Sequence, residues 1–244
     1  MKNFANREVC DLIIEDYATG EPWTFIDYAN VTTNELTGET VFAYGGKGHP
    51  KRVAFTGERG GTLAIETQLM NMKLYSFITG ADIEKSAKIY KREKVKCETA
   101  DTLTVSQTPV VGTIVVFPEE DDCGAAVTGD ATATGKEISL SGLKANDTYI
   151  VYYITEKTTG VQKINIKSST FPKSFRVYAD TFQKTEDDEV LAYHMTAYKC
   201  IPQSNFSVSF SNNGDPATIT ITCDLMADED LNLLDYVLDE GEAA

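Results

Sequence analysis

The chain has 244 residues, of which 42% are hydrophobic and 10% aromatic, and its formal net charge is −15. This length is enough for one large domain or two modest ones, each with its own core, and the apolar content is too high for a disordered chain. The acidic excess argues against a nucleic-acid-binding protein, which needs lysine and arginine to outnumber acids on some face.

The sequence also argues against membrane, secreted and zinc-binding classes. No stretch approaches the roughly 18 to 20 consecutive apolar residues of a membrane span, and the start of the chain lacks the apolar core of a secretion signal. We therefore expect a protein made in a cytosol. The five cysteines are spread singly, without a Cys-x-x-Cys pair or a close histidine, which favours reduced and mostly buried thiols. They are Cys10, Cys97, Cys123, Cys200 and Cys223.

Strand patterns dominate the first part of the chain. Short apolar-polar alternations rich in Val, Ile, Thr, Tyr and Phe, separated by Gly, Asn, Asp and Pro, are typical of β-strands. These alternations predict strands over Val9–Tyr17, Trp23–Val31, Val41–Tyr44 and Arg52–Phe55.

One internal segment has the spacing of a helix, from Thr67 to Thr79. Thr67 is suited to cap its N-terminus, and Gly80 stands where a left-handed residue ends many helices. We therefore predict one helix packed against a sheet. Its predicted buried positions are Met70, Leu74, Phe77 and Ile78.

The next segment is basic in an otherwise acidic chain. Strand alternation places Lys88, Tyr90, Arg92, Lys94 and Lys96 on one face. At the other extreme, the stretch from Asp228 to Glu242 holds neither Lys nor Arg. Such segregation favours head-to-tail pairing between copies, so the basic strand is a candidate subunit contact. A solvated basic strand is the alternative.

Residues 101–146 change character and become rich in Thr, Gly, Ala and Asp. We interpret them as a possible inserted β subdomain, with a continuation of the same domain left open. The main β domain then covers residues 1–100 and 147–227, and residues 228–244 form an acidic C-terminal tail. A weaker helix over Leu231–Leu238 or a frayed tail fits that last segment. Further predicted strands are Ile114–Phe117, Tyr149–Ile154, Val161–Ile166, Ser174–Tyr178, Val190–Lys199, Asn205–Phe210 and Ala217–Leu225.

The sequence contains no recognisable catalytic, cofactor or metal site. His49 and His194 lack a serine or cysteine in a recognisable nucleophile setting. The glycine-rich stretch 45–52 is followed by a strand pattern and not by the Gly-Lys-Ser/Thr and helix of a phosphate-binding loop. The acidic runs Glu119–Asp122 and Glu186–Glu189 do not fit a calcium loop and are typical of solvated turns.

The order of these elements resembles that of phage tail tube proteins. In that family an N-terminal strand pair leads through a long glycine-containing hairpin loop to a strand, then to the only helix, then to a sheet-forming C-terminal half. These similarities of pattern cover the larger part of the chain. The matching stretches are Phe42–Gly48, Arg59–Thr67, Leu69–Gly80, Phe206–Ser211, Gly214–Pro216 and Ile219–Leu225.

The resemblance implies a mainly β fold, a two-sheet antiparallel β-sandwich or barrel of the tail tube type with one flanking helix. It also implies that six copies close into a ring, that rings stack into a hollow tube, and that viral DNA passes through without specific binding. The inner sheets of the subunits would join into one continuous barrel, which removes exposed sheet edges. The expected location is the virion tail, after synthesis in the host bacterial cytoplasm, and the expected partners are further copies and other tail proteins. The acidic excess is expected to line the channel, so that DNA slides without sticking.

Within this resemblance, the stretch from Tyr44 to Arg59 is the candidate ring-stacking loop. It is long for a hairpin connection, its glycines let the backbone bend, and it carries cations that acids of the next ring, including those of the C-terminal tail, would meet. A flexible surface loop without a partner is the alternative. The residues of this candidate are Tyr44, Gly45, Gly46, Lys47, Gly48, His49, Lys51, Arg52 and Arg59.

Three other functions remain open at this point. A tail terminator or baseplate hub would share a similar sandwich. A carbohydrate-binding β-sandwich module would need exposed aromatic side chains on one sheet face, whereas the only tryptophan, Trp23, lies in an apolar strand. An enzyme is disfavoured because no catalytic arrangement stands out.

Overall fold

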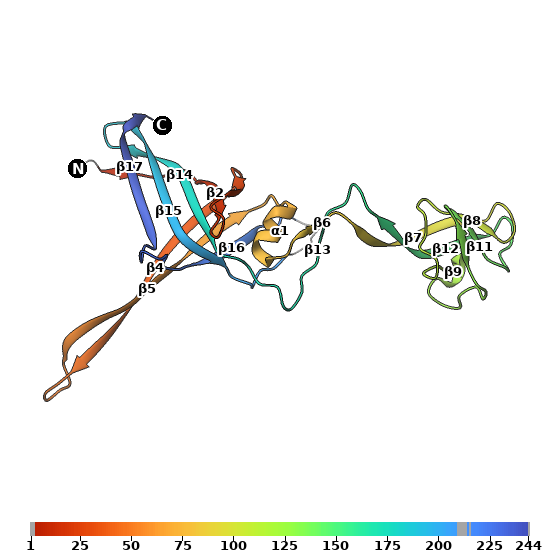
Figure 1. Ribbon diagram of the computed structural model, residues 1–244, viewed down its shortest axis with the longest axis horizontal. Helices are drawn as coiled ribbons and strands as arrows, with labels where there is room; N and C mark the ends of the chain where they lie inside the picture. The colour runs from red at the N-terminus through yellow and green to blue at the C-terminus, as the bar shows by residue number, and fades with distance from the viewer. Residues whose placement is uncertain (1–2, 209–213, 215, 244) are drawn as a thin grey trace. The chain divides into compact units, whose positions relative to one another are not determined.

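The computed structural model describes residues 3–208, 214 and 216–243, and the chain divides into two compact units (Figure 1). The first unit comprises residues 1–82 and 165–244, and the second comprises residues 83–164. The second unit contains the stretch 101–146 together with its flanks on both sides. Each unit has its own hydrophobic core. The predicted mainly β class is confirmed, because antiparallel sheets and one α-helix make up the described secondary structure apart from one short 3-10 turn.

The first unit is built on a branched nine-stranded antiparallel sheet. Its main path runs in the order β3-β2-β14-β15-β16-β5-β4, with β1 added to β14 and β17 added to β15. The strands are β1 (Phe4–Ala5), β2 (Asp11–Asp16), β3 (Pro22–Ile26), β4 (Val31–Tyr44), β5 (Lys51–Thr67), β14 (Phe175–Thr185), β15 (Val190–Pro202), β16 (Ile219–Leu225) and β17 (Leu234–Ala243).

The long strand β15 is the point at which this sheet turns into two layers. It pairs with β14 over most of its length, with β17 from Leu191 to Ala197, and with β16 from Cys200 to Pro202. The β5–β4 half then faces β15 and β17, because Asn34 of β4 places its Nδ2 3.8 Å from the Sδ of Met195 on β15. The described strands form a two-layer sandwich and do not close into a barrel.

Strand alternation explains the core of the first unit. In β16 the apolar residues Ile219, Ile221, Cys223 and Leu225 are buried, while the residues between them are exposed or half-buried. The same period of two recurs in β2, β5 and β14, as expected for strands with one face toward a core. Both halves of the sheet contribute to a single hydrophobic cluster.

The helix α1 (Met72–Thr79) closes this core, although it begins later than the sequence predicts. The predicted cap Thr67 is wrong: Thr67 ends β5, and its buried hydroxyl bonds within the turn that follows. Asn71 caps the helix instead, its side chain accepting a 2.9 Å hydrogen bond from the Leu74 amide. Gly80 ends it in the left-handed conformation, φ 69°, as predicted. Leu74, Phe77 and Ile78 are buried, and Met70 precedes the helix and packs partly buried against the same core.

Two other predictions fail in the C-terminal region. Residues from Leu231 to Leu238 form no helix, because from Leu234 onward they pair with β15 as strand β17. Residues 205–208 are not in a strand, and the last two positions of the strand predicted over Asn205–Phe210 lie outside the described residues. The predicted strands Val41–Tyr44 and Arg52–Phe55 exist as the ends of the much longer β4 and β5.

The second unit contains three small antiparallel sheets. Its core includes the fully buried Tyr153, Leu103 and Ile138. The sheets are β7-β12-β9, β10-β11-β8 and the pair β13-β6, and η1 (Glu119–Asp121) is a 3-10 turn. The strands are β6 (Ile83–Glu84), β7 (Ala87–Lys96), β8 (Thr102–Thr104), β9 (Val115–Pro118), β10 (Thr132–Thr134), β11 (Glu137–Ser139), β12 (Thr148–Lys157) and β13 (Lys163–Ile164).

Candidate functional site

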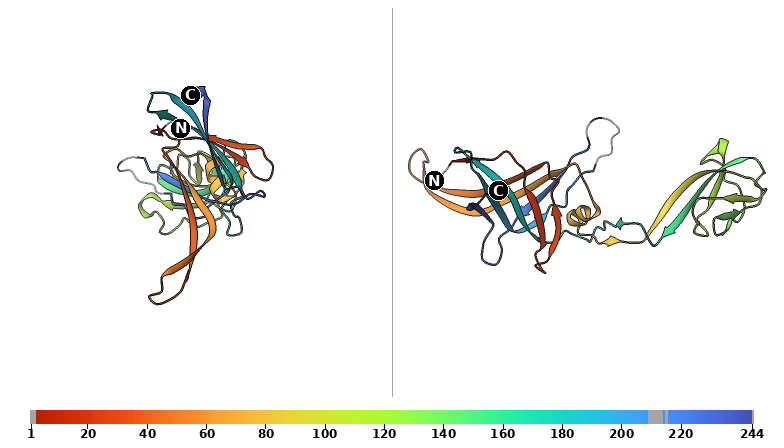
Figure 2. Two further views of the ribbon diagram at one scale, coloured as in Figure 1. Left: turned by 90° about the vertical axis from the view of Figure 1, so that its left-hand side faces the viewer. Right: turned by 90° about the horizontal axis from the view of Figure 1, so that it is seen from above.

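The most prominent surface feature of the first unit is a two-stranded ribbon formed by the distal halves of β4 and β5. Every residue from Leu36 to Tyr44 and from Lys51 to Arg59 except Phe42 is exposed, and Figure 1 and the left view of Figure 2 show the orange ribbon leaving the body of that unit. Pairing continues to Tyr44↔Lys51, so the connecting turn is only residues 45–50. The stretch 44–59, expected as a long loop, is therefore mostly paired strand. Gly46 and Gly48 lie in the left-handed region at φ 87° and 85°, which glycine adopts without strain.

The ribbon exposes apolar side chains to solvent. Every residue of β5 from Lys51 to Arg59 is exposed. Val41 lies opposite Phe55 on one face, where their side chains are 56% and 58% exposed, and Val53 on the same face is 50% exposed. An isolated two-stranded ribbon is marginal in water, and exposed apolar strands mark association sites. The ribbon is therefore a surface suited to a partner.

The tip of the ribbon is cationic. Lys47, Lys51 and Arg52 lie in or beside the turn, and the Lys51 ammonium sits 3.7 Å from the centre of the Phe42 ring. Arg52 donates from Nε to the Gly45 carbonyl at 3.2 Å, which ties the end of the turn together. The structure separates Arg59 from these residues, because it pairs with Gly38 near the base of the ribbon. His49 is exposed within the turn.

The predicted basic face lies on strand β7 in the second unit. Residues along β7 alternate between half-buried and exposed, and all five candidates fall on the exposed set. Tyr90 is 64% exposed, and its ring centre lies 6.0 Å from that of Tyr152 on β12. The exposed residues are Lys88, Tyr90, Arg92, Lys94 and Lys96.

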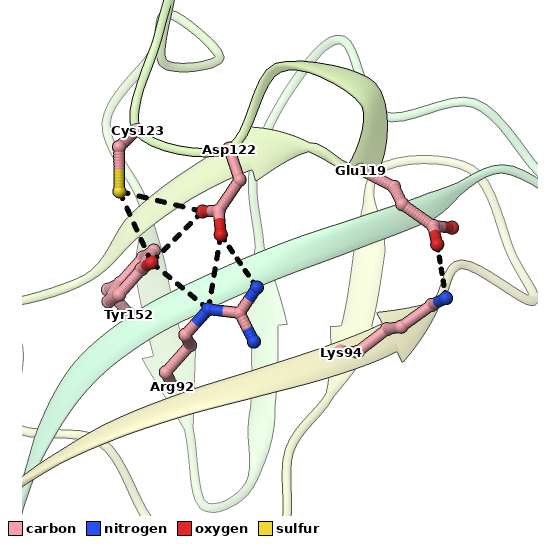
Figure 3. A network of polar contacts seen from close by, with 6 residues as sticks. All are labelled: Arg92, Lys94, Glu119, Asp122, Cys123 and Tyr152. Atoms are coloured by element: carbon pink, nitrogen blue, oxygen red, sulfur yellow. Dashed lines mark hydrogen bonds and ion pairs between the residues drawn. The ribbon is translucent and has the colours of Figure 1, made fainter.

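Two cations of this face already have partners inside the chain (Figure 3). Arg92 Nη2 lies 2.6 Å from Asp122 Oδ2, and Arg92 Nε donates to Asp122 Oδ2 and to the Tyr152 hydroxyl, both at 3.1 Å. Lys94 forms an ion pair with Glu119. Two residues of the acidic run Glu119–Asp122, which was expected to be solvated, thus bind β7 and neutralise part of the basic face. Sequence reasoning missed this because residues 119–122 and 92–94 meet only through the β9–β12–β7 pairing.

The protonation states of Asp122 and Tyr152 favour the contacts that hold this cluster together. Hydrogen bonding from Arg92 holds the pKa of Asp122 below its usual value. The Cys123 thiol, partial desolvation and the Asp122 carboxylate together raise the pKa of Tyr152 to about 12, against the opposing effect of Arg92. At neutral pH Asp122 is therefore ionised and Tyr152 is protonated, donating to Asp122 Oδ1 at 3.0 Å. The cluster joins an ion pair to a hydrogen bond and anchors the loop that follows β9.

His194, the other histidine considered for chemistry, has a local partner. His194 on β15 places Nδ1 2.7 Å from Oδ1 of its cross-strand neighbour Asp180.

Among residues 3–208, 214 and 216–243, no group of three or more His, Cys, Asp and Glu side chains is arranged to hold a metal ion. No helix in that part of the chain is long and apolar enough to cross a membrane.

A groove of about 780 Å³ lies at the base of the ribbon, and no sequence pattern predicts it. One wall is the base of β4 and β5, from Leu36 to Gly38 with Arg59 and Gly60, and the other is the connection between β16 and β17. Asp228 folds that connection by accepting hydrogen bonds from the amides of Asp230 and Asn232. Residues that line the second wall are Ala227, Leu231, Asn232, Leu233, Leu234 and Asp235.

The two-layer sandwich with its exposed apolar ribbon is a β fold suited to association. A family model described as the YomU/Tube protein family matches residues 6–237, and the chain belongs to this family. The family name indicates a structural protein of the phage tail tube, with a place in the virion tail, and confirms the predicted resemblance. No curated protein matches the chain.

Proposed function

We propose that copies of this chain close into rings, six to a ring, and that the rings stack into the tail tube through which viral DNA passes. The observation that carries the proposal is the β4–β5 ribbon. It leaves the sandwich with apolar side chains exposed, including Val41, Val53 and Phe55. Burial of apolar area stabilises an interface by roughly 25 cal/mol per Å², so covering this ribbon favours assembly.

Ring closure would use the free ends of the sheet. The strand order of the first unit ends at β3 on one side and at β4 on the other. Unpaired edges are templates for another strand, and joining the edges of neighbouring copies would turn separate sheets into a continuous barrel. This arrangement supports a closed ring, with the ribbon left free to reach the next ring.

The basic strand β7 is proposed as a second contact between copies or with other tail proteins. Arg92 and Lys94 are held by Asp122 and Glu119, so the contact would fall on Lys88, Tyr90 and Lys96. Single exposed ion pairs contribute only about 0 to 1 kcal/mol. Repetition around a ring would make such contacts significant.

Charge supports passage of DNA without specific binding. The first unit holds 25 acidic and 12 basic residues, whereas the second holds 12 and 10. The acidic excess is therefore concentrated in the unit that would build the barrel. A polyanion such as DNA is repelled by an acidic lumen, which keeps it from sticking.

Removal of the ribbon tip tests the proposal. Residues 46–52 are replaced by a two-residue turn, and assembly is followed by sedimentation and negative-stain microscopy. A matched control replaces the turn 158–160 of the second unit with two glycines. We expect the first variant to fold with an unchanged secondary structure by circular dichroism but to form no tubes, while the control assembles. Full-length tubes from the tip-deleted protein would refute the stacking role.

A further inference from the structure

We infer that the groove at the base of the ribbon receives the ribbon tip of a second copy in the adjacent ring. The inference rests on the proposed stacking function and names the surface that the ribbon binds. Its basis is the complementary chemistry of two distant parts of the same unit, the groove walls and the tip.

The groove combines exposed apolar surface with acidic residues. Leu36 is 56% exposed on one wall, and Leu231 is 81% exposed on the other. Asp235 lines the groove, and Glu229 and Asp230 stand exposed in the connection that forms the second wall. The whole stretch from Asp228 to Glu242 contains no lysine or arginine. The groove therefore has an exposed leucine on each wall and an acidic rim along the second wall, formed by Asp235 and the neighbouring Glu229 and Asp230. Arg59 is the one cation among its lining residues in the described part of the chain.

The ribbon tip has the opposite character. Residues 45–52 carry Lys47, Lys51 and Arg52 and no acid. Beside these cations, Tyr44 is 59% exposed and Val53 is 50% exposed. The tip thus presents apolar side chains to fill a groove and cations to meet an acidic rim, which is the complementarity expected of a specific contact.

The acidic wall is ordered before any partner arrives. Partial desolvation raises the pKa of Asp228, but hydrogen bonds from Asn232 and Asp230 outweigh it, and the pKa lies below its usual value. The ionised carboxylate holds Asn232 through the backbone amide at 2.7 Å and through the side chain at 3.2 Å. A wall fixed in this way loses little conformational freedom when a partner binds.

The occupant has to come from another copy. Within one chain, the paired ribbon runs from Leu36 at the groove to Tyr44 beside the turn, which is about 26 Å at about 3.3 Å per residue, and it points away from the body of its own unit (Figure 1). A tip that cannot return to its own groove can reach the same groove of a copy displaced along the ribbon. Such a contact joins two different surfaces of identical chains, so it propagates from copy to copy as an open stack.

Charge reversal on each side, alone and combined, tests this pairing. The groove variant carries Glu229→Lys and Asp230→Lys, which leave the Asp228 hydrogen bonds in place. The tip variant carries Lys47→Glu and Lys51→Glu. A control with Glu21→Lys and Asp187→Lys makes the same charge change as the groove variant, at exposed positions away from the groove and the tip. Circular dichroism checks that every variant folds.

We expect the groove variant and the tip variant each to raise the critical concentration for tube formation by about tenfold or more, which corresponds to about 1.4 kcal/mol. The chain that carries both reversals should recover most of the assembly, and the control should assemble like the unmodified chain. Normal assembly of the groove variant, failure of the combined chain to recover, or an equal loss in the control would each overturn the inference. If the groove variant assembles while deletion of residues 46–52 blocks tubes, the stacking function stands and only its receptor is wrong. If the deleted protein still forms tubes, the stacking function itself fails.

Discussion

Two adjacent glycines at the base of the ribbon, Gly60 and Gly61, are expected to respond in opposite directions to the same substitution. A Cβ at Gly61 would lie 2.3 Å from the carbonyl oxygen of Glu35 and 3.2 Å from Leu225 Cδ1. The carbonyl belongs to the paired strand β4, so the two strands would have to separate. Overpacking of this kind costs about 1 to 3 kcal/mol. A Cβ at Gly60 has Thr37 Oγ1 as its nearest neighbour, at an ordinary 3.7 Å.

Neither glycine lies in the left-handed region, so the comparison isolates the steric effect. Gly61→Ala should lower the free energy of unfolding by about 1 to 3 kcal/mol. Gly60→Ala should leave it unchanged or raise it by up to about 1 kcal/mol, because alanine restricts the unfolded chain.

Denaturant unfolding followed by tryptophan fluorescence measures this difference within the first unit. The only tryptophan, Trp23, packs in the core of that unit, with its ring centre 5.5 Å from that of Phe175. Equal midpoints for the two variants would refute the reasoning, since the close approach of β4 and β5 at Gly61 would then have no energetic consequence.

Three further outcomes follow from the structure. Leu74→Ala should cost about 2 to 5 kcal/mol by the same fluorescence assay, because Leu74 is 1% exposed, and a loss below about 1 kcal/mol would show that the helix is peripheral. Arg92→Ala should speed proteolysis of the acidic loop after β9. In the unmodified chain the same loosening should appear on acidification, because the pKa of Asp122 is lower in the folded than in the unfolded chain. The stability that Asp122 contributes is fully present above its unfolded-state pKa and is lost as the pH falls through its folded-state pKa. Unchanged cleavage rates in both cases would contradict the anchor. Finally, the groove contact limits the axial repeat to the reach of the ribbon, which is about 26 Å of paired strand from Leu36 to Tyr44 plus the turn and a lysine side chain, and a repeat above about 45 Å by cryo-electron microscopy would place the groove out of reach.

The strands were largely predictable because one buried face imposes a period of two. Ile219 to Leu225 alternates apolar and polar residues, and the structure buries the apolar set. The face of β7 followed from the same rule. These predictions needed only the geometry of a strand, which is local.

Features that depend on pairing between distant segments were missed. Thr67 has the right chemistry for a helix cap, but its place in β5, opposite Ile219, keeps it in the sheet, and Asn71 takes the cap. The sequence predicts a weak helix or a frayed tail over Leu231–Leu238, whereas an open edge of β15 recruits the chain from Leu234 onward as strand β17. Local propensity is a weak guide wherever a sheet edge offers backbone hydrogen bonds.

The two units differ in whether their exposed cations are paired within the chain, and this difference bears on assembly. In the second unit, 10 basic residues face 12 acidic ones, and Arg92 and Lys94 are paired within the chain. The first unit is strongly acidic as a whole, but no ion pair between described residues involves Lys47, Lys51 or Arg52 of the ribbon tip. Cations held away from the acids of their own unit contribute little to the stability of a single copy. Their placement favours a contact with another acidic copy, and the loss of that contact at high salt should separate stacked rings while each subunit stays folded.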